Sequence, residues 1–254
     1  MLQKFLIKSV VVTGANRGIG LELVKYFVEQ NKQYEGHSQP VKVISCSRCS
    51  SPELDDLLDH ISHIELEVTD AKSVSMAAKK VSDIVGPDGL NLLINNAAIT
   101  YHENGVIGCS DQEMRETLDV NVLGPHSVTN KFYPLLKQAA ECNSHIPLCC
   151  ARAAVLNISS ELGSILNTNN SFTTAYRVSK AALNMLTKCQ ASEFIKDGII
   201  SMSVHPGWVR TDLGGPRAPL STQESVEDIA HMIAHCTEDH NGMYVRKNLV
   251  SVPY

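Results

Sequence analysis

The sequence predicts a doubly wound α/β fold, in which helices cover both faces of a seven-stranded parallel sheet. Short runs rich in β-branched residues alternate with longer stretches of helical period along the chain. No linker rich in Gly, Pro or Ser divides the 254 residues, so we expect a single domain over residues 1–254. Strands that alternate with helices need crossover connections. Such connections produce a parallel sheet whose ligands bind beyond the carboxyl ends of the strands.

The predicted elements follow the apolar pattern in order along the chain. The first strand is the run FLIKSVVVT, and the turn residues Gly86, Pro87 and Gly89 mark the break before the fourth strand. The expected strands are Phe5–Thr13, Val41–Ser45, Ile64–Val68, Leu90–Ile94, Ala153–Ile158, Ile199–Val204 and Met243–Val245. The expected helices are Ile19–Asn31, Pro52–His60, Ala71–Val85, Asp111–Ala140, Thr174–Lys196 and Thr222–Cys236. The irregular segments Glu141–Arg152 and Asn167–Phe172 are expected to be surface loops.

Composition and charge narrow the possible functions. The chain has 22 Lys and Arg against 27 Asp and Glu, a net charge of −5, and no basic block, so we expect no nucleic-acid partner. Its eight cysteines are irregularly spaced, which favours reduced thiols in the cytoplasm. Lys4 and Lys8 interrupt the apolar N-terminal run, and nowhere do about 18 apolar residues follow one another. We therefore expect neither a signal peptide nor a membrane partner.

A glycine-rich turn joins the first predicted strand to the first helix. The segment Thr13–Gly20 reads TGANRGIG. Glycines at a helix N-terminus let backbone N–H groups approach a pyrophosphate closely. The glycines stand at positions 14, 18 and 20, which departs from the GxGxxG spacing and leaves an ordinary strand-to-helix turn as the alternative. The place of the turn, directly after the first strand, favours phosphate binding.

Six motifs in register give the chain a specific resemblance. TGANRGIG resembles the TGxxxGIG turn of the short-chain dehydrogenase/reductase family, and the other motifs of that family follow in order over nearly the whole chain. They are Asn95-Asn96-Ala97-Ala98, Asn121, Ser159-Ser160, Tyr176-Arg177-Val178-Ser179-Lys180 and His205-Pro206-Gly207-Trp208-Val209-Arg210-Thr211. Three segments are most similar to the sniffer-type and C-factor-like carbonyl reductases: NISSELGSI, AYRVSKAALNM and HPGWVRTDLGG. The resemblance implies a Rossmann fold.

Tyr176 and Lys180 are the expected acid–base pair. They lie four residues apart, so a helix places both side chains on one face, although a lone Tyr-x-x-x-Lys is usually an ordinary helix surface. A lysine charge about 4 Å from a phenol, whose pKa is near 10, would stabilise the phenolate by roughly 4 kcal/mol at a dielectric of 20. The resemblance implies that Ser160 stabilises the substrate oxygen. It also implies that Asn121 holds a water linked to Lys180. Ser159 is expected only to form hydrogen bonds at the end of the strand.

Cofactor choice rests on two arginines. Ser47 stands where NAD-preferring relatives carry an acidic residue, and Arg48 follows it, which favours the 2′-phosphate of NADP(H). Arg17 could reach the same phosphate. Two positions depart from the family, because Ala98 replaces a glycine and Glu67 an aspartate. The expected cofactor-binding residues are Gly14, Asn16, Arg17, Gly18, Ile19, Gly20, Arg48, Val68, Asn95, Ala97, Tyr176, Lys180, Pro206, Gly207, Val209 and Thr211.

Two other patterns are assigned no chemistry. His231 and His235 lie four residues apart but lack the HExxH glutamate and a third ligand, so we expect no metal site. Cys46 and Cys49 form CSRC across the predicted phosphate loop, where a thioredoxin-like role would collide with the neighbouring arginine.

The sequence therefore predicts an NADPH-dependent carbonyl reductase that acts on a small ketone, aldehyde or quinone. An NADP(H)-binding sensor with little turnover and an NAD-dependent alcohol or steroid dehydrogenase are the alternatives. The flap at Asp212–Ser221 is short, which indicates an open site with broad substrate acceptance. By resemblance we expect a homodimer formed through the helices that carry Asn121 and Tyr176.

Overall fold

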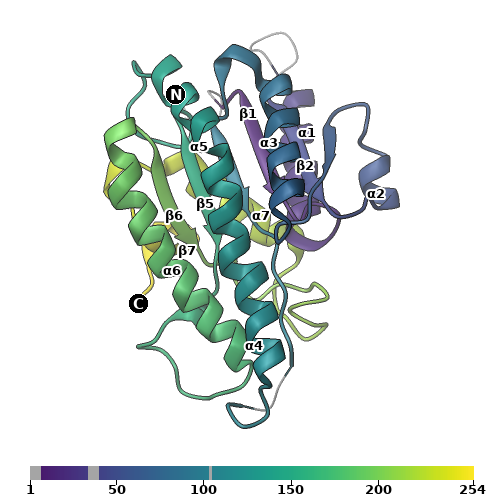
Figure 1. Ribbon diagram of the computed structural model, residues 1–254, viewed down its shortest axis with the longest axis vertical. Helices are drawn as coiled ribbons and strands as arrows, with labels where there is room; N and C mark the ends of the chain where they lie inside the picture. The colour runs from purple at the N-terminus through teal and green to yellow at the C-terminus, as the bar shows by residue number, and fades with distance from the viewer. Residues whose placement is uncertain (1–6, 34–39, 103–104) are drawn as a thin grey trace.

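The computed structural model describes residues 7–33, 40–102 and 105–254 (Figure 1). These residues form an eight-stranded sheet in the order β3-β2-β1-β4-β5-β6-β7-β8. The strands are β1 (Ser9–Thr13), β2 (Lys42–Ser47), β3 (Ser62–Glu65), β4 (Leu92–Asn95), β5 (Ala154–Ile158), β6 (Ile200–Val204), β7 (Tyr244–Arg246) and β8 (Val250–Ser251). The first seven are parallel, as predicted, and β8 is antiparallel to β7. The predicted count of seven missed β8, because two residues carry no periodicity. Residues 5–6 of the first predicted strand lie outside the described residues.

Helices cover both faces of the sheet, which confirms the predicted doubly wound architecture. In one core cluster, α1 and α7 pack against the sheet together, and in the other α3 and α5 cover the opposite face beside α6 (Figure 1). The helices are α1 (Gly18–Gln33), α2 (Pro52–Asp55), α3 (Ala71–Val85), α4 (Asp111–Leu118), α5 (Gly124–Cys142), α6 (Thr174–Phe194) and α7 (Thr222–His235). The helix predicted over Pro52–His60 is shorter because the chain continues after Asp55 in tight turns, such as His60 N–H to Leu57 C=O at 2.8 Å.

The helix boundaries have local causes. Ser110 and Glu113 form a capping box that begins α4, and Ser221 and Glu224 form another that begins α7. The stretch predicted as one helix over Asp111–Ala140 contains a π-helical turn at Asp119–Leu123, which separates α4 from α5. A π-helical turn widens the helix by one residue and often lies at a functional site.

The central strands are buried on both faces, and their carboxyl ends meet at one edge. Every residue of β1, β4, β5 and β6 is buried, as expected for parallel strands covered by helices on both sides. The segments that follow these four strands begin at Gly14, Asn96, Ser159 and His205. They border one cleft. Within the described ranges, no helix combines the length and apolarity that a membrane span requires.

Asn91 connects three segments of the sheet below that edge. Its side chain is fully buried. The Oδ1 atom accepts the N–H of Lys8 at 3.1 Å and the hydroxyl of Ser9 at 3.3 Å. The Nδ2 atom donates to the carbonyl oxygens of Ala151 at 2.8 Å and Arg152 at 3.1 Å. One amide therefore links the starts of β1, β4 and β5.

We predict that Asn91→Ala lowers the free energy of unfolding by about 2–3 kcal/mol, because it leaves buried backbone groups without partners. Urea denaturation followed by circular dichroism measures this loss. Asn169→Ala, at an exposed position, is the matched control and should change stability by less than about 0.5 kcal/mol. Equal midpoints for the two variants would show that the Asn91 side chain does not hold the strands together.

Candidate active site

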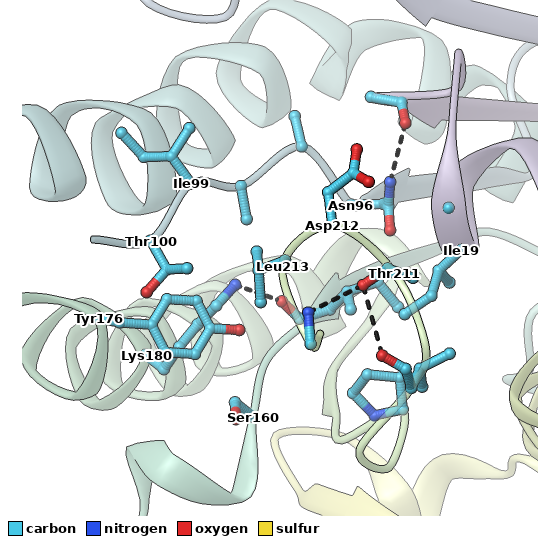
Figure 2. A pocket seen from close by; sticks show the side chains of 18 of the residues that line it. Ile19, Asn96, Ile99, Thr100, Ser160, Tyr176, Lys180, Thr211, Asp212 and Leu213 are labelled. Atoms are coloured by element: carbon cyan, nitrogen blue, oxygen red, sulfur yellow. Dashed lines mark hydrogen bonds between the residues drawn. The ribbon is translucent and has the colours of Figure 1, made fainter. Parts of the chain in front are cut away.

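A cleft of about 1280 Å³ follows the carboxyl edge of the sheet. Figure 2 shows Ser160, Tyr176 and Lys180 on one side of it and Ile19 and Asn96 on the other, with the segment that begins at Thr211 between them. The cleft therefore brings together residues that are up to about 200 positions apart in the chain.

The glycine-rich turn lines one end of the cleft and needs glycine for steric reasons. Gly14 and Gly18 have φ values of +64° and +56°, a region that side chains disfavour. A Cβ atom on Gly14 would lie 2.8 Å from Ala97 Cα. A Cβ atom on Gly20 would lie 2.3 Å from the carbonyl oxygen of Gly14. The predicted tight turn is thus present, and Gly20 closes it without itself bordering the cleft.

Asn96, rather than the predicted Asn95, faces this turn. Asn96 Nδ2 donates to the carbonyl oxygens of Thr13 at 2.9 Å and Gly14 at 3.2 Å. Asn95 is buried within the sheet layer, where its Nδ2 donates to Asn157 Oδ1 at 2.8 Å, and it does not border the cleft. The assignment of Asn95 to cofactor binding is therefore corrected. Asn95 is the last residue of β4 and Asn96 lies just beyond it, so the two neighbouring side chains have different surroundings.

Arg48 lies at the glycine-rich end of the cleft, as predicted. Its Nη1 atom is 3.6 Å from Glu67 Oε2, and both residues border the cleft. Glu67, which replaces the family's aspartate, also accepts the N–H of Thr69 at 3.1 Å. The last residue of β2 is Ser47, which has a hydroxyl in place of a carboxylate. This hydroxyl donates to the carbonyl oxygen of Cys49 at 2.8 Å. Arg48 is mostly exposed and retains donors for an anion.

Arg17 forms an ion pair with the flap, and its predicted contact with a 2′-phosphate stays a prediction. Its Nη1 atom lies 2.6 Å from Asp212 Oδ2, at the start of the predicted flap, and both side chains are largely exposed. This ion pair joins the glycine-rich turn to the flap across the cleft, because both residues line it. Both arginines that the sequence assigned to the 2′-phosphate therefore line the cleft, and each also pairs with a carboxylate.

Ser159 and Ser160 have different surroundings. The Ser159 hydroxyl donates to Asn184 Oδ1 at 2.7 Å inside the protein. Ser160 borders the cleft and is hydrogen-bonded to Tyr176. The Ser160 hydroxyl also accepts the N–H of Leu162 at 3.2 Å.

The peptide group between Ser160 and Glu161 is held at both ends. Its carbonyl oxygen accepts the hydroxyl of buried Tyr244. Its N–H donates to His205 Nδ1 at 3.0 Å. Burial lowers the pKa of His205 to about 4, partly offset by Glu161, so at neutral pH the ring is neutral and can accept this bond. Tyr244 is not among the residues predicted from the sequence, because nothing in its local sequence marks a buried tyrosine hydroxyl, which usually has a hydrogen-bond partner.

Tyr176 and Lys180 lie together on α6, as their spacing predicted. Tyr176 is 7% exposed and Lys180 2% exposed. Lys180 Nζ donates to the carbonyl oxygen of Ile158 at 2.7 Å and lies 5.4 Å from the centre of the Tyr176 ring. The bond connects α6 to the end of β5 and brings the phenol beside Ser160.

Burial controls the protonation of both groups. It raises the pKa of Tyr176 to about 12, and the hydrogen bond with Ser160 offsets part of that rise. Burial lowers the pKa of Lys180 to about 7. The expectation that the lysine charge brings the phenol pKa down is therefore corrected, because the loss of water disfavours both charged forms. Tyr176 holds its proton at neutral pH.

Asn121 lies in the π-helical turn and is fully buried behind the cleft wall. Its Oδ1 atom accepts the N–H of Ile99 at 2.9 Å, and its Nδ2 atom donates to Ser179 Oγ at 3.0 Å. The Ser179 hydroxyl in turn donates to the carbonyl oxygen of Tyr176 at 2.7 Å. Asn121 is thus connected to the first turns of α6, and it does not border the cleft directly.

The remaining predicted cofactor residues surround the same cleft. Gly207 has a φ of +84°, and the carbonyl oxygen of Pro206 accepts the Ser225 hydroxyl at 2.7 Å. Thr211 Oγ1 accepts the N–H of Gly214 at 3.1 Å, which shapes the start of the flap. The lining also includes residues that the sequence prediction did not assign, notably Thr100, Trp208 and Leu213. The predicted residues on the lining are Gly14, Asn16, Arg17, Gly18, Ile19, Arg48, Val68, Ala97, Ser160, Tyr176, Lys180, Pro206, Gly207, Val209 and Thr211.

Residues 8–219 match the short chain dehydrogenase family, and the chain belongs to this family of oxidoreductases. C-signal from Myxococcus xanthus is 31% identical over 179 residues, which cover 70% of this chain and 100% of that protein.

Solved structures agree with this assignment. The carbonyl reductase Sniffer of D. melanogaster is similar with a TM-score of 0.89 at 32% identity, over 98% of this chain and 100% of that one. An NADPH-bound carbonyl reductase from chicken fatty liver has a TM-score of 0.87 at 33% identity, over 98% and 99% of the two chains. These proteins are similar to this chain over its whole fold.

The lowered pKa of Lys180 predicts how stability depends on pH. Between about pH 7 and pH 10 the unfolded lysine binds a proton that the folded one has lost, so stability rises with pH in this window. Relative to Lys180→Met, the wild-type protein should gain roughly 2 kcal/mol between pH 7.5 and pH 9.5. The raised pKa of Tyr176 acts only above about pH 10 and in both proteins.

Urea unfolding at several pH values measures this difference. Lys188→Met changes an exposed lysine of the same helix and should follow the wild-type curve. Parallel curves for the wild type and Lys180→Met would mean that the buried amine keeps its proton on folding.

Proposed function

We propose that this protein is an NADPH-dependent carbonyl reductase that reduces ketones, aldehydes or quinones. The observation that carries the proposal is the group of Ser160, Tyr176 and Lys180 on a cleft whose other end carries the glycine-rich turn and Arg48. The similarity to Sniffer and to an NADPH-bound carbonyl reductase supports it. Because binding alone does not need a buried Tyr–Lys pair, we favour turnover over a sensor role.

The cleft suits a dinucleotide. Its volume of about 1280 Å³ exceeds the range of roughly 300–1,000 Å³ that is usual for one small ligand. The crowded glycines leave only backbone at the turn, where pyrophosphate would bind. Arg48 would hold the 2′-phosphate, Lys180 the ribose hydroxyls, and Val209 and Thr211 would border the nicotinamide. When bound, NADPH supplies the hydride for the carbonyl carbon.

Side chains of the protein supply the proton that the substrate oxygen receives. Tyr176 carries a proton on its phenol oxygen at neutral pH and donates it to the substrate oxygen. Ser160 donates a second hydrogen bond to the same oxygen as negative charge develops there. Lys180 changes protonation near neutral pH, so it can help to resupply the proton. Asn121 supports the turn of α6 that carries Tyr176 and Lys180.

The proposal extends to the organisation of the protein. Residues 1–254 form a single domain, and Asp212–Ser221 is a short substrate flap. The protein works in the cytoplasm as a homodimer. Exposed apolar side chains of the π-helical turn and α6 support a dimer contact there: Leu123 is 57% exposed and Met185 64% exposed.

Tyr176→Phe tests the reaction. We expect kcat for NADPH oxidation with quinones and aromatic aldehydes to fall at least about 100-fold, because the proton donor is lost. The Kd of NADPH, measured by fluorescence titration, should change little. Tyr133→Phe removes a hydroxyl that hydrogen-bonds Asp197 outside the cleft, and it should keep near-normal turnover.

Two results would contradict the proposal. Normal turnover by Tyr176→Phe would remove the phenol from the reaction. A wild-type protein that binds NADPH but oxidises it with no carbonyl compound would be a sensor.

Arg48→Asp tests cofactor choice. We expect kcat/KM for NADPH to fall at least about tenfold and the preference to shift toward NADH, because a carboxylate repels the 2′-phosphate and accepts a ribose hydroxyl. Initial rates with both cofactors measure this. Arg115→Asp makes the same charge change at an exposed site outside the cleft and should leave the ratio unchanged. Equal kcat/KM for NADPH and NADH in the wild type would contradict the assignment.

A further inference from the structure

Arg177 borders the cleft directly after Tyr176 in the sequence. It belongs to the first turns of α6, and the neighbouring cleft wall is the segment between β5 and α6. Several uncharged polar side chains of this segment line the cleft, and His102 lines it from the segment after β4. Two basic side chains of α6 line the cleft, Lys180 and Arg177.

Arg177 is partly exposed, and two hydrogen bonds at the surface hold its guanidinium. Its Nε atom donates to the carbonyl oxygen of Phe172 at 2.8 Å. Its Nη2 atom donates to Asn170 Oδ1 at 2.7 Å. An arginine has five N–H donors, so these two bonds leave three available. Both hydrogen-bond partners are neutral, so the positive charge of the Arg177 guanidinium has no negatively charged partner.

Among the described residues, two arginines line the cleft without an ion pair: Arg210, which is exposed and donates to the carbonyl oxygens of Ala218 and Pro219, and Arg177, which is less exposed and follows Tyr176 directly. All three carboxylates among the lining residues have a cationic partner. These pairs are Arg48 with Glu67, Arg17 with Asp212, and Arg246 with Glu161. Across the part of the chain that the structure describes, no ion pair involves Arg177. Burial lowers the pKa of Arg177, and no carboxylate opposes that shift.

We propose that Arg177 binds a carboxylate of the substrate, so that the preferred substrates are carboxylate-bearing aldehydes and ketones. This inference rests on the proposed function, because it takes Tyr176 as the position of the carbonyl oxygen. A guanidinium held in a partly buried site forms charge-assisted hydrogen bonds with a carboxylate. Such bonds correspond to an increase in affinity of roughly 10- to 100-fold over a neutral analogue.

The geometry also indicates the shape of the substrate. Consecutive helix residues point about 100° apart around the axis, so Tyr176 and Arg177 direct the two polar groups of the substrate to different sides. Leu162, Trp208 and Leu213 supply apolar surface on the same cleft. These features favour a carbonyl and a carboxylate separated by an apolar spacer such as an aromatic ring, rather than joined directly.

The first experiment compares 4-carboxybenzaldehyde with its methyl ester, using NADPH oxidation by the wild type and by Arg177→Met. We expect the acid-to-ester ratio of kcat/KM to fall at least about tenfold in Arg177→Met. Comparing variants on each substrate cancels the difference in intrinsic reactivity. Asn170→Ala removes one anchor of the guanidinium but keeps its charge, so it should retain most of the ratio. An unchanged ratio in Arg177→Met would overturn the inference.

The second experiment does not depend on turnover or on the folding of a variant. Calorimetry measures the binding of benzoate and of benzamide to the wild-type protein saturated with NADP⁺. We expect benzoate to bind at least about tenfold more tightly, with an affinity that weakens as salt increases. Equal affinities would overturn the inference. If no aldehyde is reduced but benzoate still binds selectively, the proposed function fails while the carboxylate site stands.

Discussion

The hydrogen bond from the buried Lys180 amine to the carbonyl oxygen of Ile158 determines the geometry of the site. It joins α6 to the last residue of β5, so Tyr176, one helical turn earlier, lies beside Ser160, two residues beyond the strand. Asn121 supports the same helix through Ser179. The candidate catalytic groups therefore depend on helix–sheet packing, which is rigid, and less on the surface loops that close the cleft.

Much of this arrangement is predictable from local patterns. The β-branched runs predicted the seven parallel strands, and the spacing of Tyr176 and Lys180 predicted their common face. The errors have physical causes. Asn95 and Asn96 share a motif, but Asn95 is hydrogen-bonded inside the sheet layer as the last residue of β4, whereas Asn96 lies just beyond the strand and contacts the glycine-rich turn, and the motif alone does not separate them. The ion pair of Arg17 with Asp212, which is 195 positions away, is a contact that only the folded chain reveals, and the contact of Arg17 with a 2′-phosphate stays a prediction.

Burial and charge act on different parts of the cleft. At its centre, the loss of water raises the pKa of Tyr176 and lowers that of Lys180, so Tyr176 stays protonated at neutral pH while Lys180 changes its protonation there. Around the rim, ion pairs with Arg48 and Arg17 balance two of the carboxylates. Arg177 adds a charge between these regions, and the nature of the substrate decides what balances it.

The central claim is that hydride transfer to a carbonyl carbon takes place beside Tyr176. Its most direct test is a single turnover with NADPH that carries deuterium at C4, followed by NMR of the alcohol formed from an aromatic aldehyde. The account predicts one deuterium on the carbinol carbon with the wild type and almost no alcohol with Tyr176→Phe. Alcohol that contains no deuterium, or equal yields from both proteins, would contradict it.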